Sequence, residues 1–333
     1  MSMTSEASLA AAKDFVARHI VWDNHSCMPL RADDSFLPTL ERCRSVGQTA
    51  ITLNIGFDIT SVEADLRTLA HFRSWVKRHP ERYILLQTPG DVIAAKAQGL
   101  LAVGFDIEGA CALGDQLSLL ELYYDLGVRW MSFVYNKNNS AGGGCQDEDT
   151  GLTPFGRDVL EEMQRLGMLP CVSHTGWKTA RQVLSLAQGP VIFSHSNAYA
   201  VHPHPRNIPD DLAKACAETG GVIGINGLGR FIGDNDNSTR GWFRHVDHMV
   251  ALVGPEHVGV ALDYVWDLDE ARAWYKSRPD LYPPDKGYVG PSANIEPERL
   301  PALVAIMFEH GYPEDVIVAI MGGNHMRIAQ VWK

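Results

Sequence analysis

Two apolar segments of the chain each end in the dipeptide Ser-His. Cys171-Val172-Ser173-His174 and Ile192-Phe193-Ser194-His195 place the two histidines 21 residues apart, about one strand–helix unit. Neutral imidazole is a ligand for zinc and related first-row metals. If the two segments are neighbouring strands of a barrel, both rings reach one ion. The alternative is that each ring hydrogen-bonds a loop carbonyl.

Two carboxylates stand in comparable positions. Glu108 lies in Phe105-Asp106-Ile107-Glu108-Gly109, and Asp263 follows the apolar segment Val258–Leu262. A carboxylate such as Glu108 can bridge two metal ions, and Asp263 is placed to serve as general base for a metal-activated water. The structural alternatives are a helix cap for Glu108 and a hydrogen-bonded strand end for Asp263.

His25 and Cys27 are separated by one residue, in Asn24-His25-Ser26-Cys27. Alternate residues of an extended segment point to the same side, so both can hold one ion, Cys27 as a thiolate. The alternative for Cys27 is a buried, inert thiol. Arg206 offers a fork-shaped donor for a substrate carboxylate, or else it forms a surface ion pair.

These residues require a fold that brings distant segments to one edge. Short apolar segments recur along the chain with helical patterns between most of them, as is typical of parallel strands buried on both faces. We therefore predict an α/β fold, a closed (β/α)8 TIM barrel forming a single domain over residues 1–333, with its site at the C-terminal strand ends. The eight expected strands are Ile20–Trp22, Thr49–Ile55, Leu101–Phe105, Arg129–Val134, Leu169–Val172, Val191–Phe193, Gly221–Ile225 and Val258–Leu262.

Several other segments have recognisable roles. Thr153-Pro154 predicts the start of a helix over Phe155–Leu166, and Pro209 predicts one over Asp210–Thr219. Residues 1–19 are expected to form an N-terminal helical extension. The polar, aromatic-rich residues 265–297 are too long for an ordinary loop, so they form either a lid over the barrel mouth or a surface excursion.

Composition narrows the class of partner. Lys and Arg number 29 against 40 Asp and Glu, a formal charge of −11, and there is no basic block, which argues against a nucleic-acid partner. The chain contains no run of about 18 apolar residues, so no membrane span is predicted, and the N-terminus lacks the pattern of a secretory signal. The six cysteines are scattered without CxxC pairs. We expect a soluble, cytoplasmic protein with a small-molecule substrate.

Longer motifs connect these residues. They include Gly151-Leu-Thr-Pro-Phe-Gly156, Ser173-His174, Phe193-Ser-His-Ser196, Pro205-Arg-Asn-Ile-Pro-Asp210, His257-Val-Gly-Val260 and Gly322-Gly-Asn-His-Met-Arg-Ile328. From about residue 20 to the C-terminus, the chain resembles the membrane (renal) dipeptidase family of zinc peptidases, within the amidohydrolase-like metal barrels. The resemblance implies hydrolysis of short dipeptides, including those with a D-residue on the C-terminal side, by a barrel that is usually a homodimer.

The resemblance also implies roles for individual residues. It implies two zinc ions bridged by Glu108, although one ion remains an alternative. One ion would also use His25 and Cys27, and the other would use His174 and His195. Arg206 would bind the free carboxylate of the substrate, and Asp263 would be the acid/base.

Two positions depart from the family pattern. The family has His-x-Asp where this chain has His25-Ser26-Cys27. A thiolate keeps a negative ligand but favours softer metals, so the alternatives at the first site are a changed metal or loss of that metal. The family has Thr-His-Asn where this chain has Val134-Tyr135-Asn136. Tyr135 can bind substrate and donate a hydrogen bond to an oxyanion, but it cannot carry an imidazolium charge.

Three functions are compatible with these residues. The leading hypothesis is a metal-dependent hydrolase that cleaves the amide bond of a dipeptide or dipeptide-like molecule through a metal-activated water. The second is a specialised mono- or binuclear metal enzyme acting on a non-peptide amide, lactone or carboxylate. The third is a barrel that binds a ligand without turnover, against which the full set of potential ligands argues.

Overall fold

The strands form one parallel sheet. The structure, a computed structural model, describes residues 6–288 and 292–333, and every strand pair within them is parallel. All eight residues of the fourth strand, Leu101–Glu108, are buried, and apart from Asp106 and Glu108 its sequence is apolar, as in a parallel strand covered on both faces. The strands are β1 (Trp22–Cys27), β2 (Ala50–Phe57), β3 (Tyr83–Leu85), β4 (Leu101–Glu108), β5 (Val128–Ser132), β6 (Leu169–Cys171), β7 (Ile223–Asn226), β8 (Val258–Ala261) and β9 (Tyr264–Val265).

The sheet curls into a barrel. Its strand order is β6-β5-β4-β2-β1-β8-β7, and the gap between β6 and β7 is closed by residues 191–193 through the bridges Cys171↔Ile192 and Phe193↔Ile223. The predicted strand Val191–Phe193 therefore occupies its position in the barrel but is wrong as a strand. Only Ile192 and Phe193 pair with the neighbouring strands, so the segment provides isolated bridges between β6 and β7.

Other differences from the predicted strands concern short or polar segments. The first strand is Trp22–Cys27 instead of Ile20–Trp22, so the prediction was wrong about its end: His25 and Cys27 lie within β1, in polar sequence. The three-residue β3 pairs with the start of β4, and the two-residue β9 pairs with the end of β1. Neither strand is long enough to show a strand-like pattern of apolar residues in the sequence.

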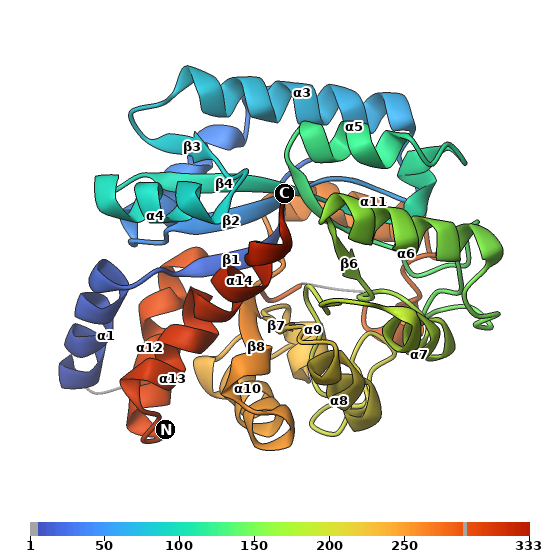
Figure 1. The fold of residues 1–333 in the computed structure, drawn as a ribbon. Coiled ribbons are helices and arrows are strands. Elements are labelled where there is room, and N and C mark those ends of the chain that lie inside the picture. Colours follow the sequence, from blue (N-terminus) through green and yellow to red (C-terminus); the bar gives the residue numbers. More distant parts are fainter. Residues whose placement is uncertain (1–5, 289–291) are drawn as a thin grey trace.

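Helices cover the outside of the curled sheet (Figure 1). The predicted helix after Thr153 is confirmed as α6, where the Thr153 hydroxyl accepts a hydrogen bond from the Gly156 N–H and Pro154 occupies the first turn. The helices are α1 (Glu6–Arg18), α2 (Glu41–Ser45), α3 (Val62–Arg78), α4 (Pro89–Gln98), α5 (Leu119–Asp125), α6 (Pro154–Leu166), α7 (Trp177–Leu186), α8 (Asp210–Glu218), α9 (Gly229–Ile232), α10 (Thr239–Val253), α11 (Leu268–Ser277), α12 (Leu300–Glu309), α13 (Glu314–Val318) and α14 (Asn324–Ile328).

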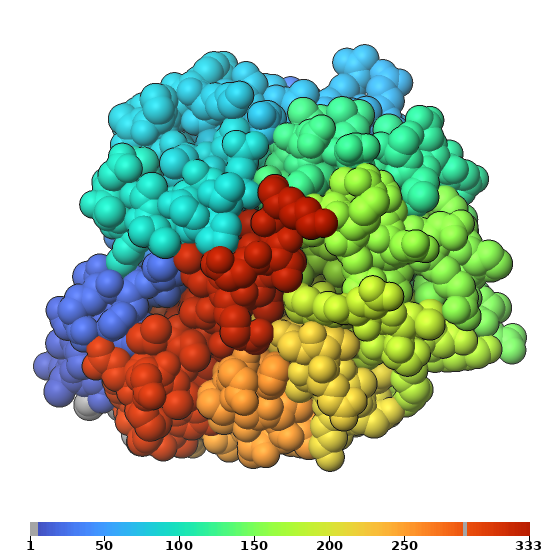
Figure 2. Space-filling view, in the orientation of Figure 1, coloured from blue at the N-terminus to red at the C-terminus, as the bar shows by residue number. Residues whose placement is uncertain are grey.

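The C-terminal segment closes the barrel from one side, whereas α1 lies on the outside beside α12 (Figure 1). Of the expected extension 1–19, residues 1–5 lie outside the described residues, and α1 packs on α12 with Ala12, Phe15 and Val16 buried. The C-terminal segment crosses the centre of the face seen in Figure 2. There Trp332 packs against Trp22 at the start of β1. The N-terminal end of the barrel is thus filled, which leaves the opposite end for the site.

The segment 265–297 lies at that opposite end and contains α11, although residues 289–291 are outside the described ones. Leu281, Tyr282 and Tyr288 of this segment are buried against Leu228 and Phe231, at the start of and within α9. Within the described residues, no helix combines the length and the apolar character needed to cross a membrane.

Candidate metal centre and substrate site

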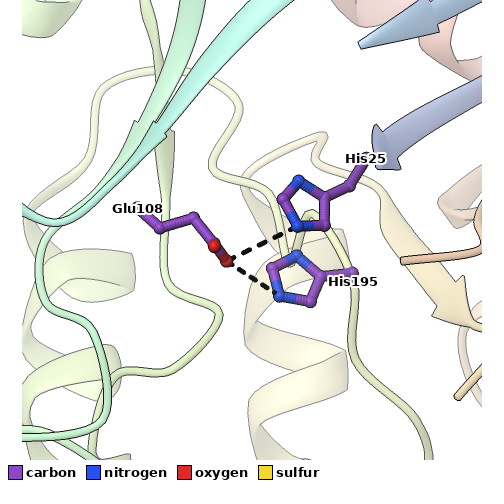
Figure 3. A group of neighbouring side chains, drawn as sticks. All are labelled: His25, Glu108 and His195. Atoms are coloured by element: carbon purple, nitrogen blue, oxygen red, sulfur yellow. Dashed lines mark ion pairs between the residues drawn. The ribbon is translucent and has the colours of Figure 1, made fainter. Parts of the chain in front are cut away.

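Four side chains converge at the C-terminal ends of the strands. Glu108 is the last residue of β4, His25 lies in β1, and His174 and His195 follow β6 and the bridge residue Phe193. Glu108 Oε1 lies 2.9 Å from His174 Nε2, 3.2 Å from His195 Nε2 and 3.6 Å from His25 Nε2. Figure 3 shows Glu108 reaching across the barrel toward the rings of His25 and His195.

A second group adjoins the first and shares His25. Cys27 Sγ lies 3.6 Å from His25 Nε2 and 3.0 Å from Asp263 Oδ1, and the same carboxylate oxygen lies 3.5 Å from His25 Nε2. The ligand atoms of His25, Glu108 and His195, and likewise those of His25, Cys27 and Asp263, all lie within 4.8 Å of one another. The structure therefore brings together the five residues predicted to bind metal and the predicted acid/base.

The ring nitrogens that face away from the centre have partners. His25 Nδ1 lies 3.1 Å from Asp106 Oδ2, His174 Nδ1 lies 2.7 Å from Asn136 Oδ1, and His195 Nδ1 lies 2.8 Å from Ser194 Oγ. Such contacts fix the ring orientation and leave each Nε2 directed at the centre. The sequence analysis did not assign Asn136 or Ser194, although each adjoins an assigned residue.

The carboxylates are held in a similar way. Asn54 donates from Nδ2 to Glu108 Oε2 at 3.3 Å and to Asp106 at 3.1 Å, and Asn226 donates to Asp263 Oδ2 at 2.7 Å. Sequence reasoning missed Asn54 and Asn226. The available signal was an amide inside or ending an otherwise apolar strand.

Burial favours the neutral form of two of the histidines. It lowers the pKa of His174 and of His195 well below the usual histidine value, and the positive charges of Arg206 and His25 add to this effect. This favours the neutral imidazole form of both rings, which is the form that binds a metal. For His25, burial also lowers the pKa, but Asp106 and Glu108 raise it by more, so the result lies well above the usual value.

The acidic groups of the centre are shifted toward their protonated forms. Burial raises the pKa of Glu108 to about 8, and burial together with the Asp263 charge raises the pKa of the Cys27 thiol well above its usual value. A bound cation acts in the opposite direction, because it stabilises both carboxylate and thiolate.

The residues present fit a metal ion. Glu108 Oε1 is buried and accepts no hydrogen bond of acceptable geometry from any described residue, although three imidazole nitrogens surround it. A carboxylate oxygen among Nε2 atoms that are themselves oriented from behind is a nitrogen–oxygen donor set typical of zinc. His174 and Asp263 also adopt positive φ angles of 65° and 54°, in the left-handed region that non-glycine residues adopt uncommonly and that recurs at functional sites.

Two predicted substrate-binding residues flank the centre. The Tyr135 ring stacks on the His174 ring with centroids 4.3 Å apart, and its hydroxyl lies 3.1 Å from that of Tyr282. Arg206 is buried, donates to the His195 carbonyl at 3.4 Å, and forms no ion pair within the described residues. Its Nε has no hydrogen-bond partner there either. Arg206 is thus a buried cation rather than a residue of a surface ion pair.

A cavity of about 180 Å³ opens beside the centre, and Cys27, Glu108 and Tyr135 line it together with residues of α11. The segment 265–297 therefore forms part of the cavity wall. A larger cavity of about 710 Å³ lies at the other end of the barrel, at the start of β6, and none of the candidate ligands lines it.

The comparisons with known proteins agree with this geometry. The family model of the membrane dipeptidases (peptidase family M19) matches residues 12–270, more than half of the chain, so the chain belongs to this family. Dipeptidases of this family are metal-dependent hydrolases. Dipeptidase aclJ of Aspergillus oryzae is 30% identical over 228 residues, which cover 67% of this chain and 49% of that protein. The chain thus spans about half the length of this curated relative.

Solved structures confirm the barrel fold. An amidohydrolase from Pseudomonas aeruginosa has a TM-score of 0.87 at 25% identity, with 96% of this chain and 99% of that chain covered. A metallo peptidase from Rhodobacter sphaeroides, liganded with a phosphinate mimic of the dipeptide L-Ala-D-Ala, has a TM-score of 0.78 at 23% identity, with 95% and 100% covered.

Proposed function

We propose that this protein hydrolyses the amide bond of a dipeptide or dipeptide-like molecule that carries a free carboxylate. The observation that carries the proposal is the convergence of three imidazole Nε2 atoms on the buried Glu108 Oε1, at 2.9 to 3.6 Å. Membership of the dipeptidase family and the fold shared with a protein bound to a dipeptide mimic support it.

The metal is proposed to be zinc, with two ions favoured. His174, His195 and Glu108 would hold one ion, and His25, Cys27 and Glu108 would hold the other. Glu108 Oε1 lies within 3.6 Å of the Nε2 atoms of all three histidines, so it is placed to serve both ligand sets, and the family resemblance supports two ions. Ions held by these residues would supply Lewis-acid polarisation of the scissile carbonyl and activation of a water.

Asp263 is proposed to move the proton. Its Oδ2 accepts the hydrogen bond from Asn226, which leaves Oδ1 facing His25 and Cys27 at the centre. From this position the carboxylate can take a proton from the attacking water and deliver it to the leaving nitrogen.

Tyr135 is proposed to stabilise the oxyanion. Burial and the neighbouring Tyr282 raise the pKa of its phenol well above the usual value, so the hydroxyl keeps its proton and can donate it in a hydrogen bond. Asp58, which accepts a hydrogen bond from the Tyr135 N–H at 2.7 Å, fixes the backbone that carries the ring.

Arg206 is proposed to bind the substrate carboxylate. A buried guanidinium with an unused Nε and no ion pair among the described residues is costly unless an anion accompanies it, and a carboxylate matches its planar donors. The family resemblance also supports a homodimer, and we propose that this dimer is cytoplasmic.

The test is hydrolysis of a panel of dipeptides by zinc-reconstituted protein, with L-Ala-D-Ala included. Arg206→Ala is expected to raise KM on the order of a hundredfold for free-carboxylate dipeptides, and much less for the same dipeptides as C-terminal amides. Arg206→Lys serves as the matched control that keeps the charge. If no member of the panel is hydrolysed, the proposal is wrong.

The second candidate is altered chemistry on a non-peptide amide, lactone or carboxylate. Two residues favour it. Cys27 places a thiol among the candidate ligands and Tyr135 places a phenol beside them, where the family that this chain resembles has a carboxylate and an imidazole. A panel in which lactones or simple amides react faster than every dipeptide would establish this candidate instead.

A further inference from the structure

Aromatic rings form a box over one side of the substrate cavity. Five of the residues lining it are Phe57, Tyr135, Trp274, Tyr275 and Tyr282. The Phe57 ring meets the Tyr135 ring at 61° with centroids 5.0 Å apart and the Trp274 ring at 74° and 6.2 Å. Tyr282 meets Tyr135 at 72° and 6.4 Å and Tyr275 at 59° and 4.7 Å. Rings at these angles pack edge to face, and because all five line the cavity they form one aromatic side of it.

The charges around this aromatic box are acidic. Asp267 and Glu270 line the cavity on the side away from the proposed metal ligands, and no Lys, Arg or His is among the described residues that line it. Arg31 offsets part of this charge, because it lies 3.6 Å from Asp267 and 3.4 Å from Glu270. A cationic group is favoured here by the ring faces and by the net negative lining.

Not every ring is equally available. Arg230 lies 4.7 Å from the Tyr275 centroid, and the Tyr135 ring is stacked on His174. Phe57 and Trp274 have no stacked guanidinium or imidazole within the described residues, and Trp274 is 39% exposed. These two rings are therefore the ones that can respond to a ligand cation.

Most hydrogen-bond acceptors in the aromatic box already have partners, and Glu270 accepts from Arg31 at 3.4 Å. Asp267 accepts from the N–H groups of Asp269 and Glu270 at the start of α11, and it also faces Arg31. The Tyr135 and Tyr282 hydroxyls bond to each other. A primary ammonium would leave N–H groups without partners here, whereas a methylated ammonium has few or none to satisfy.

From these observations we propose that the aromatic box receives a methylated, permanently cationic ammonium on the acyl side of the substrate, so that N-trimethylated acyl-amino acids are preferred. The inference rests on the proposed hydrolase function and names its substrate class. For trimethylglycyl-alanine, water adds across the amide bond. The acyl carbon gains the hydroxyl and becomes the carboxylate of trimethylglycine, and the nitrogen gains the proton and becomes the amino group of alanine.

The test compares three substrates that share alanine, in both stereoisomers: trimethylglycyl-alanine, its uncharged isostere tert-butylacetyl-alanine, and glycyl-alanine. The two bulky acyl groups have nearly the same shape, so the ratio of their kcat/KM values reports the effect of the charge, which includes its inductive activation of the amide. The change of this ratio in ring variants isolates the contribution of the aromatic box. We expect trimethylglycyl-alanine to exceed tert-butylacetyl-alanine by about tenfold or more, and to exceed glycyl-alanine as well.

Matched variants identify the rings. Trp274→Phe keeps an aromatic face and Trp274→Leu keeps only apolar bulk. Phe57→Tyr and Phe57→Leu form a second pair. The ratio between the cationic substrate and its isostere is expected to fall several-fold in each leucine variant and to stay within about twofold in each aromatic one. Because the readout is a ratio within one protein, a general loss of activity or folding does not mimic the effect.

The outcomes separate this inference from the function on which it rests. Hydrolysis of glycyl-alanine with equal or faster cleavage of the uncharged isostere overturns the aromatic box while the hydrolase function stands. A ratio that leucine does not change also overturns it. If none of the three is cleaved, the proposed function fails, and calorimetric titration of the two bulky ligands decides whether the box still prefers the cation.

Discussion

Two regions of this barrel each bury a carboxylate whose pKa is raised to near neutrality. Burial raises the pKa of Glu108 at the barrel mouth to about 8 and that of Asp65, on α3, to about 7. Glu108 faces three imidazole nitrogens. Asp65 Oδ1 accepts only the Thr60 hydroxyl, at 2.5 Å, and its Oδ2 has no hydrogen-bond partner among the described residues.

The difference shows that a perturbed pKa does not by itself mark a site. Both carboxylates are shifted by the same physical cause, the loss of hydration. Only at the mouth do further donor atoms converge, each oriented by a partner such as Asp106 or Asn136. Substitutions of the residues around Glu108, at the mouth of the barrel, should therefore reduce metal binding and turnover. Removing the charge of Asp65 on α3, in the outer wall of the barrel, should increase stability without reducing activity.

The largest expected effect is that of His195→Ala. This change removes one of the Nε2 atoms around Glu108, so metal content should fall, and kcat/KM should fall on the order of a thousandfold or more. Zinc should also no longer raise the unfolding temperature as it does in the unchanged protein. Elemental analysis, thermal unfolding with and without zinc, and dipeptide kinetics measure these three changes.

His248→Ala is the matched control for that variant. His248 is half-buried, pairs with Asp210 at 2.8 Å, and lies on α10 away from the ligands. It should keep both metal and activity. Full zinc content and turnover in His195→Ala would show that the convergence at Glu108 is not a metal centre.

Cys27 variants should have the next largest effect. Cys27→Ala is expected to lower zinc occupancy from about two toward one per chain and to lower kcat/KM roughly a hundredfold, since a negatively charged ligand is lost. Cys27→Asp should retain both ions, because it restores a carboxylate. In the cobalt-substituted protein, a sulfur-to-cobalt charge-transfer band should be present and should disappear in both variants. A cobalt protein without this band would place Cys27 outside the metal centre.

The groups behind the ligands should matter less. Asp106→Asn keeps the shape of the side chain but removes the charge that faces His25 Nδ1, so metal affinity should fall roughly tenfold to a hundredfold. Ser194→Ala removes a neutral partner of His195 and should cost less than that. Competition with a zinc chelator measures both affinities. Equal losses in the two variants would mean that the charge of Asp106 does not contribute.

Much of this site was predictable because parallel strands end at one edge. Glu108, His174, His195 and Asp263 follow or end apolar segments, so the barrel topology alone brings them together. The order of chemistry-bearing residues along the chain was therefore sufficient to expect the cluster that the structure shows.

The partners behind the ligands were harder to predict. Asn54, Asn226 and Asp106 lie within or at the end of strands, and nothing in their sequence spacing distinguishes an inward amide from one that bonds its own backbone. The aromatic box depends on contacts between β2, the loop after β5 and α11, and such long-range packing has no local pattern. The sequence of β1 is polar and so did not predict a strand beyond Trp22, because it is the pairing with β2 that holds this segment extended.

The smallest expected effect lies on the wall, at Asp65, and it concerns stability alone. The pKa of Asp65 is raised in the folded protein by burial and by the charge of Asp58. Its contribution to stability is therefore fully present below the unfolded value of about 4 and is lost as the pH rises through about 7. The side chain at position 65 in the Asp65→Asn variant is uncharged at every pH. The unfolding temperature of this variant should therefore exceed that of the unchanged protein by a few degrees at pH 8 and by less at pH 5.

Asp158→Asn, on the exposed side of α6, is the control and should show no such trend. Since Asp65 lies outside the ligand cluster, kcat/KM should stay within about twofold. A stability difference that does not change with pH would mean that the amide acts through packing against Gly56, and the contrast between wall and mouth would then not rest on charge.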